Sequence, residues 1–181
     1  MVSLRIIAGR YLPAMLLAKT GAFSELYPMT NLVYIDTSVV GGVFDKEFEL
    51  WTNMFFKSVE DQVFKIATSA LLEAELESAP EHVRSFLDGI ADKNRIEVDY
   101  NEEAIGLADI YQAEGIVGPT SLTDCRHIAT ATVNQINILA SWNFKHIVNL
   151  NKIRLYNAVN LKNGYNVLEI RTPRELLEYE N

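Results

Sequence analysis

Hydrophobic and polar residues follow one another along the chain in blocks that predict strands separated by helices. Leu32–Ile35 is a continuous apolar run with a β-branched content typical of a buried parallel strand. Further strands are predicted at four similar runs: Phe64–Thr68, Ile96–Val98, Ile138–Trp142 and Val167–Ile170. Because helical segments separate these strands, the chain is predicted to be an α/β protein with a mostly parallel sheet covered on both faces.

The intervening segments carry the spacing and the end signals of helices. After Ser121, mostly apolar residues recur at helical spacing: Cys125, Ile128, Ala129, Thr132 and Ile136. Ser69 and Asn101 are predicted N-caps, and Gly115 is a predicted helix stop. Capping boxes are predicted at three places: Ser78–Glu81, Ser121–Asp124 and Thr172–Glu175.

Polar side chains with oxygen atoms lie near the ends of the predicted strands. Asp36 follows the first strand, Asn143 follows the fourth, and Asp124 lies at the start of a helix. Glu73 and Glu75 lie on the helix after the second strand. Ligands of parallel α/β sheets gather beyond the carboxyl ends of the strands, so we expect these side chains to meet at one edge of the sheet.

Only one of the two glutamates can face that edge, because residues two apart on an α-helix point about 200° away from each other. Glu73 is in line with Glu77, as in a solvated stripe. Glu75 is in line with residues nearer the buried side: Leu71, Leu72, Ser78 and Ala79. We therefore favour Glu75 as the functional residue.

Three carboxylates brought together need compensation for their charge. Two unit charges about 4 Å apart repel by roughly 4 kcal/mol at an effective dielectric near 20, so such a cluster must hold protons or a cation. Oxygen ligands without thiols suit magnesium or manganese. An ion held in this way activates water and neutralises charge on a phosphoryl transition state, which fits hydrolysis of a phosphodiester.

Composition and charge narrow the possibilities. The 181 residues include one cysteine and three histidines, which excludes a disulfide framework and a multi-cysteine zinc cluster. The net charge of −8 argues against a protein that holds nucleic acid mainly through its phosphates, but not against an enzyme that meets phosphate through bound cations. No apolar stretch reaches the ~18 residues that a membrane span needs.

Each candidate residue also has a simpler structural interpretation. Asp36 can cap a helix, Asp124 can complete the capping box of Ser121, and Glu75 can lie on an ordinary helix surface. Asn143 fits a turn. Surface or structural roles are expected for the histidines and core positions for the nearby aromatic residues: His127, His146, Trp142 and Phe144. The functional interpretation therefore depends on the joint arrangement.

The first 30 residues differ from the rest and are predicted to form an N-terminal extension of uncertain order. They faintly resemble a secretion signal, but Arg10 and Pro13 interrupt the region, and Lys19 stands where a small-residue cleavage site is needed. We favour a loosely packed amphipathic extension, with translation from Met29 as the alternative. Residues 31–181 are predicted to form one domain.

Four segments together resemble the PIN-domain family, the nuclease fold that includes VapC-type toxins of toxin–antitoxin pairs. In chain order they are 33–39 (VYIDTSV), 68–77 (TSALLEAELE), 123–131 (TDCRHIATA) and 141–149 (SWNFKHIVN). The likeness runs from about Asn31 to about Leu150, and its last two segments are the more specific. It implies a PIN-like three-layer α/β/α fold with a mostly parallel central sheet.

The resemblance implies a role for each matching acidic residue. Asp36, Glu75 and Asp124 look like the metal-binding carboxylates, with Glu73 as the fallback for Glu75. Where many relatives have a fourth acidic residue, this chain has Asn143. An amide oxygen can ligate a hard cation or position a water, but it brings no charge.

Polar neighbours of these residues look like substrate contacts. Thr37 or Ser38 can donate a hydrogen bond to an aspartate or to the scissile phosphate. Three basic residues are candidates to hold RNA backbone phosphates: Arg126, Lys145 and Lys152. Asn149 is a weaker candidate for a loop or phosphate contact.

The implied function is a magnesium- or manganese-dependent endoribonuclease of the cytoplasm, which uses water and no side-chain nucleophile. As a toxin it would pair with an antitoxin that inserts a basic side chain into the acidic pocket, and a homodimer is also implied. Two alternatives stay open. Asn143 and the acidic balance allow a catalytically silent PIN-fold binding module, and a haloacid-dehalogenase-like phosphatase is disfavoured because Ser38 stands where its second acid belongs.

Overall fold

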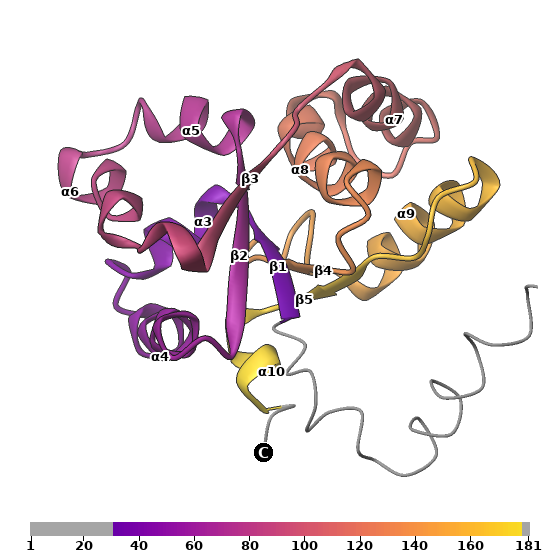
Figure 1. Ribbon diagram of the computed structural model, residues 1–181. Helices are drawn as coiled ribbons and strands as arrows, with labels where there is room; N and C mark the ends of the chain where they lie inside the picture. The colour runs from indigo at the N-terminus through magenta and orange to yellow at the C-terminus, as the bar shows by residue number, and fades with distance from the viewer. Residues whose placement is uncertain (1–30, 179–181) are drawn as a thin grey trace, which may run out of the picture. The chain divides into compact units, whose positions relative to one another are not determined.

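A parallel five-stranded sheet lies at the centre of the part of the chain that the structure describes (Figure 1). The structure is a computed structural model that describes residues 31–178. Its strands are β1 (Asn31–Ile35), β2 (Phe64–Ser69), β3 (Arg95–Val98), β4 (Ile138–Ala140) and β5 (Glu169–Arg171), in the order β3-β2-β1-β4-β5. All neighbouring strands pair in parallel, and Val33 of β1 lies opposite Ile66 of β2 and Ile138 of β4.

Helices cover both faces of this sheet (Figure 1). One face packs against α3 (Thr37–Gly42), α4 (Glu49–Glu60), α5 (Ala70–Leu76), α6 (Glu81–Arg84) and α10 (Pro173–Glu178). The other packs against α7 (Glu102–Ala113), α8 (Leu122–Val133) and α9 (Leu150–Lys162). Short 3-10 turns are η1 (Leu87–Gly89), η2 (Asp92–Asn94) and η3 (Pro119–Ser121). The predicted three-layer α/β/α architecture is confirmed, with a sheet that is parallel throughout.

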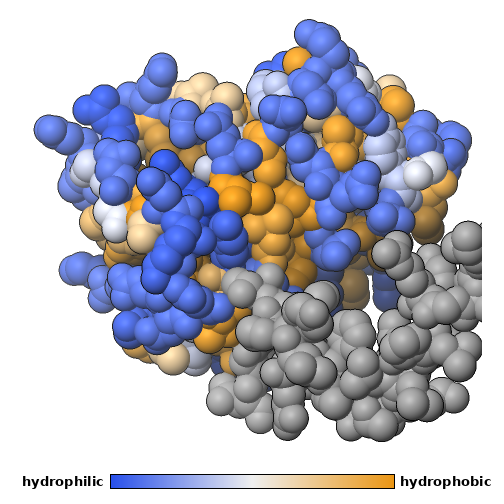
Figure 2. Space-filling model, in the orientation of Figure 1, coloured by the Kyte–Doolittle hydropathy of each residue, from blue (hydrophilic) through white to orange (hydrophobic). Residues whose placement is uncertain are grey.

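Two hydrophobic cores follow from the alternation of side chains along the strands. Val33 and Ile35 lie in the core under α3, α4 and α5, whereas Tyr34 between them lies in the core under α7 and α8. Burying an apolar side chain of this size stabilises the fold by about 1.5–3 kcal/mol. In Figure 2, hydrophilic residues cover much of the helical layers on the visible side, and apolar residues show between them.

Two predicted helix ends are confirmed by their hydrogen bonds. In the capping box before α10, the Thr172 N–H donates to Glu175 Oε2 (2.7 Å) and the Glu175 N–H donates to Thr172 Oγ1 (3.1 Å). Asn101 Oδ1 accepts from the Ala104 N–H (3.0 Å) at the start of α7. Gly115 follows that helix with φ +72°, a conformation that favours glycine.

Three other predicted caps lack the expected side-chain hydrogen bond, although Ser69 and Ser121 do stand at the N-cap positions of α5 and α8. Ser69 precedes α5, but its hydroxyl lies 2.8 Å from the Tyr34 hydroxyl instead of capping the helix. In the predicted box at Ser78–Glu81, Ser78 Oγ donates backwards to the Glu75 carbonyl, and α6 is a single turn. Ser121 precedes α8 without a side-chain capping bond. For Ser69 and Ser78, another partner takes the hydroxyl that the capping bond would have used.

Helix α9 was not predicted from the apolar pattern, and Asn149 explains how it begins. The Asn149 side chain accepts a hydrogen bond from the Lys152 N–H (3.3 Å), so its structural role is that of an N-cap. The predicted extension over residues 1–30 lies outside the described residues. Within residues 31–178, no helix has the length and apolar character that crossing a membrane requires.

Candidate active site

The carboxylates of Asp36, Glu75 and Asp124 lie beyond the carboxyl ends of the strands, and we call this region the acidic edge. Asp36 directly follows β1 and is only 4% exposed. Ser38 Oγ donates to its Oδ1 (2.6 Å) and Ser141 Oγ donates to its Oδ2 (2.8 Å). Burial raises the pKa of Asp36 even though these hydrogen bonds favour the ionised form. Asp36 is therefore a carboxylate whose charge is only partly compensated.

Glu75 lies on α5 and is held through one of its two oxygens. Its Oε2 accepts hydrogen bonds from Thr37 Oγ1 and from His127 Nε2, the latter at 2.7 Å. Burial by itself raises the pKa of Glu75, but the hydrogen bond and charge of His127, together with the Thr37 bond, outweigh it and the net shift is downward. Glu73 is exposed on the other side of the same helix. Within residues 31–178, Oε1 of Glu75 has no hydrogen-bond donor, so it faces any incoming ligand without competition.

His127 is the residue at this site that the sequence interpretation missed. It is 3% exposed, and its two ring nitrogens contact Glu75 on one side and the Tyr34 hydroxyl on the other (2.9 Å). An ionised carboxylate only accepts, so Nε2 of His127 must carry a proton. The other ring nitrogen, Nδ1, lies next to the Tyr34 hydroxyl, which in turn lies 2.8 Å from Ser69 Oγ. His127 is thus fixed in orientation by Tyr34 of β1 and Glu75 of α5.

Asp124 is paired with Asn143, the amide that stands where the resemblance predicts an acidic residue. Asn143 Nδ2 donates to Asp124 Oδ1 (2.7 Å), while its own Oδ1 accepts from the His146 N–H (3.0 Å). These two bonds fix which end of the amide faces the carboxylate. Lys152 Nζ lies 3.0 Å from His146 Nδ1, within hydrogen-bonding distance of that ring. Burial raises the pKa of Asp124, against the lowering effect of His146 and His127.

The three carboxylates form one electrostatic group. The charge of His127 lowers the pKa of each of Asp36, Glu75 and Asp124, and the charge of Glu75 raises the pKa of Asp124. The fold thus brings together residues that are far apart in the chain. Asp36 and Ser141, for example, are 105 positions apart. The prediction that these carboxylates meet in one metal site stays a prediction.

The donor set suits a hard divalent cation, but its arrangement is not closed around one. Carboxylate and amide oxygens are the ligands that magnesium and manganese prefer, and the raised pKa of Asp36 and Asp124 shows that added positive charge would stabilise their ionised forms. Within residues 31–178, however, no three His, Cys, Asp or Glu side chains are gathered closely enough to hold a metal ion. Binding would therefore require the carboxylates to move toward a common ion.

The residues predicted to contact the substrate differ in whether they already have hydrogen-bond partners in the structure. The hydroxyls of Thr37 and Ser38 already donate to Glu75 and Asp36, so they act on carboxylates in this structure. Arg126 on α8 is half-buried, and its Nε has no hydrogen-bond partner within the described part of the chain. Lys145 is exposed. Lys145 is thus open to an anion from solvent, whereas Nε of Arg126 is buried and the two hydroxyls already have partners.

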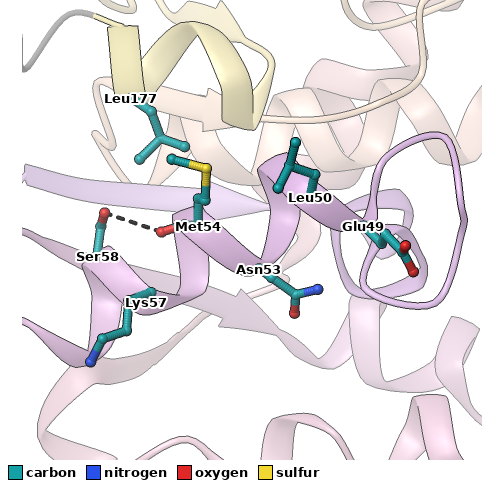
Figure 3. A pocket seen from close by; sticks show the side chains of 7 residues that line it. All are labelled: Glu49, Leu50, Asn53, Met54, Lys57, Ser58 and Leu177. Atoms are coloured by element: carbon teal, nitrogen blue, oxygen red, sulfur yellow. Dashed lines mark hydrogen bonds between the residues drawn. The ribbon is translucent and has the colours of Figure 1, made fainter.

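A surface pocket on α4 is separate from this group of residues. Figure 3 shows it along one side of the helix, with Leu177 of α10 contributing from above. It is lined by Glu49, Leu50, Asn53, Met54, Lys57, Ser58 and Leu177. None of the candidate catalytic or substrate-binding residues lines it, so it adds nothing to the acidic edge.

Comparison with known proteins supports the fold. No family model matches the chain, and no curated protein is similar enough in sequence to match it. Among solved structures, the chain is similar to one in the crystal structure of VapBC2 from Rickettsia felis bound to a DNA fragment from their promoter. The TM-score is 0.50 at 15% identity, over 78% of this chain and 98% of that chain. At this identity the likeness concerns the fold alone, and it agrees with the predicted PIN-like α/β/α arrangement.

Proposed function

We propose that this protein is a metal-dependent endoribonuclease whose magnesium or manganese ion is held by Asp36, Glu75 and Asp124. The observation that carries the proposal is the way these carboxylates are held at the carboxyl edge of the sheet. Ser38 and Ser141 donate to Asp36, His127 donates to Glu75, and Asn143 donates to Asp124. Ligands bind at this edge in parallel α/β folds. The net charge of −8 is compatible with RNA as substrate because the cation supplies the local positive charge.

In this proposal the ion supplies activated water and neutralises the charge that develops on the phosphate. The residues of the chain orient the reactants. His127 would hold Oε2 of Glu75, so that Oε1 could bind the ion, and Asn143 would keep Asp124 in place for the same purpose. Arg126 and Lys145 contact backbone phosphates of the RNA. No side chain acts as a covalent nucleophile.

The partners follow from the same proposal. The solved neighbour belongs to a VapBC2 complex with promoter DNA, which supports a toxin of a type II toxin–antitoxin pair as the biological role. Such a toxin acts on RNA in the cytoplasm, forms a homodimer, and is neutralised by an antitoxin. A guanidinium group from the antitoxin fits between carboxylates whose charge is incompletely compensated, as that of Asp36 is.

A second candidate function is a catalytically silent PIN-fold binding module. Two observations favour it: an amide stands at the fourth acidic position, and the described carboxylates and histidines do not form a ready cluster for a metal. This candidate predicts a folded protein that binds a partner, whether RNA or protein, without cleaving RNA in magnesium or manganese.

The decisive experiment combines cleavage with metal binding. Purified protein is incubated with a short single-stranded RNA in manganese or in EDTA, and the products are resolved by gel. We expect cleavage in manganese that EDTA abolishes and that both Asp36→Asn and Asp124→Asn remove. Calorimetry with manganese should show binding to the wild type that Asp124→Ala weakens.

Two results would contradict the nuclease proposal. Cleavage that survives both Asp→Asn substitutions would point to a contaminant or to another site. Manganese binding and RNA binding without any cleavage over a range of RNA sequences would favour the silent binding module.

A further inference from the structure

Phe144 is a large aromatic side chain left exposed beside the acidic edge. The sequence interpretation put it in the core, but it is 50% exposed. It directly follows Asn143, whose Nδ2 donates to Asp124. An exposed aromatic ring next to residues with functional geometry is a candidate contact for a ligand, whereas an aromatic ring needed only for packing is normally buried.

The ring of Phe144 rests on a rigid aromatic support. Its centroid lies 6.2 Å from that of Trp142 and 6.2 Å from that of Phe48, and Phe48 is stacked on Trp142 at 4.6 Å with an interplanar angle of 19°. We call these three residues the aromatic shelf. Offset and tilted aromatic contacts of this kind are favourable and hold the rings in place.

The shelf is anchored to the fold and to the acidic edge. Trp142 Nε1 donates to Thr52 Oγ1 (3.0 Å), and Gly42 lets the indole approach, because a Cβ at that position would lie 2.8 Å from Nε1. The Trp142 N–H donates to Ser38 Oγ (2.8 Å), and Ser38 in turn donates to Asp36. Asp36 and the shelf therefore share Ser38 as a common contact, so their relative position is fixed.

The charged residues around the aromatic shelf affect the phosphate of a bound nucleotide but not its neutral base. Lys145 is exposed next to Phe144, on the chain segment that leads to His146 and Lys152. The segment around Phe48 has an excess of acidic residues: Asp45, Glu47 and Glu49 are exposed, with the exposed Lys46 among them. A phosphate is attracted toward Lys145 and repelled by the acidic segment, whereas a neutral base can lie on Phe144 between them.

We propose that Phe144, supported by Trp142 and Phe48, is a stacking subsite for one unpaired nucleobase of the RNA strand, next to the scissile phosphate. This inference rests on the proposed nuclease function and deepens it, because it assigns single-stranded RNA as the form of substrate. Stacking on an exposed aromatic ring requires an unstacked base, so a loop or a single strand is accepted and a continuous duplex is rejected. Stacking is tolerant of sequence, since every base has a π-face.

Equilibrium binding separates this subsite from catalysis. A fluorescein-labelled single-stranded RNA of about ten nucleotides, within the usual length range of a single-strand site, is titrated with protein in calcium, and gels verify that the RNA stays intact. Phe144→Ala is expected to weaken binding roughly five- to a hundredfold. Phe144→Tyr, which keeps the ring, should bind as the wild type does. The matched control is Leu161→Ala, because Leu161 is similarly exposed (61%) but lies near the end of α9.

A scan of abasic positions in the RNA identifies the base that stacks. At one position, loss of the base should weaken binding to the wild type but have almost no further effect on Phe144→Ala. At the other positions, the loss of affinity from removing the base and the loss from Phe144→Ala should add. Such a result ties the ring to a single base and would not arise from general damage to the fold.

Several outcomes would overturn the subsite. They are a dissociation constant unchanged in Phe144→Ala, full binding by Phe144→Leu, or equal affinity for a duplex of the same sequence. A Phe144→Ala protein that changes its sedimentation while its RNA affinity is unaltered would assign the ring to a protein interface. If the wild-type protein does not bind RNA at all, the proposed function is refuted, and the subsite with it.

Discussion

The two sides of the acidic edge hold their carboxylates in opposite ways. On one side, Glu75 is hydrogen-bonded to His127, which is 3% exposed and also contacts the Tyr34 hydroxyl. On the other side, Asp124 is bonded to Asn143, which is half-buried at the start of a loop that includes the exposed Phe144. Both carboxylates are half-buried, but the partner of Glu75 is built into the core, whereas the partner of Asp124 belongs to a loop next to solvent.

This contrast indicates a division of labour within the proposed site. Preorganised groups contribute most when they need not rearrange during the reaction, and a buried histidine with both nitrogens engaged meets that condition. A substrate has to reach the site from the open side, where loop residues can adapt to it. We therefore expect changes on the His127 side to reduce turnover and changes on the Asn143 side to alter metal and RNA affinity.

The largest effect should come from removing the carboxylate on the buried side. Glu75→Gln keeps the shape of the side chain but removes its charge and gives it an amide donor. We expect cleavage activity in manganese to fall by about a hundredfold or more, on the scale of other losses of a preorganised catalytic group. Glu73→Gln is the matched control, because Glu73 lies on the same helix but is exposed. If both changes reduced activity equally, the assignment of Glu75 would be wrong.

Replacing His127 tests whether the buried side acts by positioning. His127→Leu removes the hydrogen bonds to both Glu75 and Tyr34, and loss of such a supporting residue typically costs about 10- to 100-fold in activity or metal affinity. His127→Gln can keep a donor toward Glu75. We expect kcat to fall in His127→Leu with little change in KM, and to recover in part in His127→Gln.

Thermal unfolding supplies the control for this comparison. Leaving a buried polar group without its partner costs about 1–3 kcal/mol, and Tyr34 loses one partner in both variants. Both variants should thus be destabilised, whereas kcat should differ between them. Equal activities in two equally stable variants would show that His127 is merely structural.

The sequence predicted the acidic edge because strand ends are local signals. An apolar run followed by Asp36 marks both the strand and the place where it ends, and parallel topology then brings such ends together. The predicted fourth strand, Ile138–Trp142, is longer than β4, which ends at Ala140. The Ser141 N–H still donates to the Arg171 carbonyl of β5 (3.1 Å), but the Trp142 N–H donates to Ser38 Oγ instead of to a neighbouring strand.

His127 and Phe144 could not be assigned in the same way. A single histidine in a helix has no local signature, and its partners Tyr34 and Glu75 lie 93 and 52 positions away in the chain. Phe144 follows a strand in a loop, where neither strand nor helix periodicity tells which side of a residue is buried. Such positions depend on tertiary contacts, which the pattern of one chain does not specify.

The open side can be altered by restoring a fourth acidic residue. Asn143→Asp replaces the donor 2.7 Å from Asp124 with a second carboxylate, so two like charges come together without compensation. We expect the melting temperature in EDTA to fall and the affinity for manganese to rise by about tenfold, because the added ligand carries charge. Calorimetry and thermal unfolding measure the two effects. Asn151→Asp on the exposed face of α9 adds the same charge away from the site, and an equal gain in affinity there would contradict the prediction.

The smallest effect concerns how the charge of the buried Asp36 changes the stability of the protein with pH. Burial raises the pKa of Asp36 above its value in the unfolded chain, so the folded state binds that proton more tightly. The stability contributed by the protonated carboxyl is fully present below the unfolded pKa and is lost as the pH rises through the folded pKa. Asp36→Asn, which stays neutral, should therefore have a higher melting temperature than the wild type at neutral pH in EDTA.

This advantage of Asp36→Asn should shrink as the pH falls toward the ordinary carboxyl range of about 4, because the wild-type side chain then becomes neutral as well. Melting temperatures of both proteins from about pH 4 to about pH 8 measure the trend, and the acid sensitivity due to Glu75 cancels in the difference. Asp109→Asn on the exposed surface of α7 is the matched control and should give a flat difference. A constant or inverted difference for Asp36→Asn would mean that the site already compensates its charge without a cation, and the case for a metal at the acidic edge would lose its electrostatic basis.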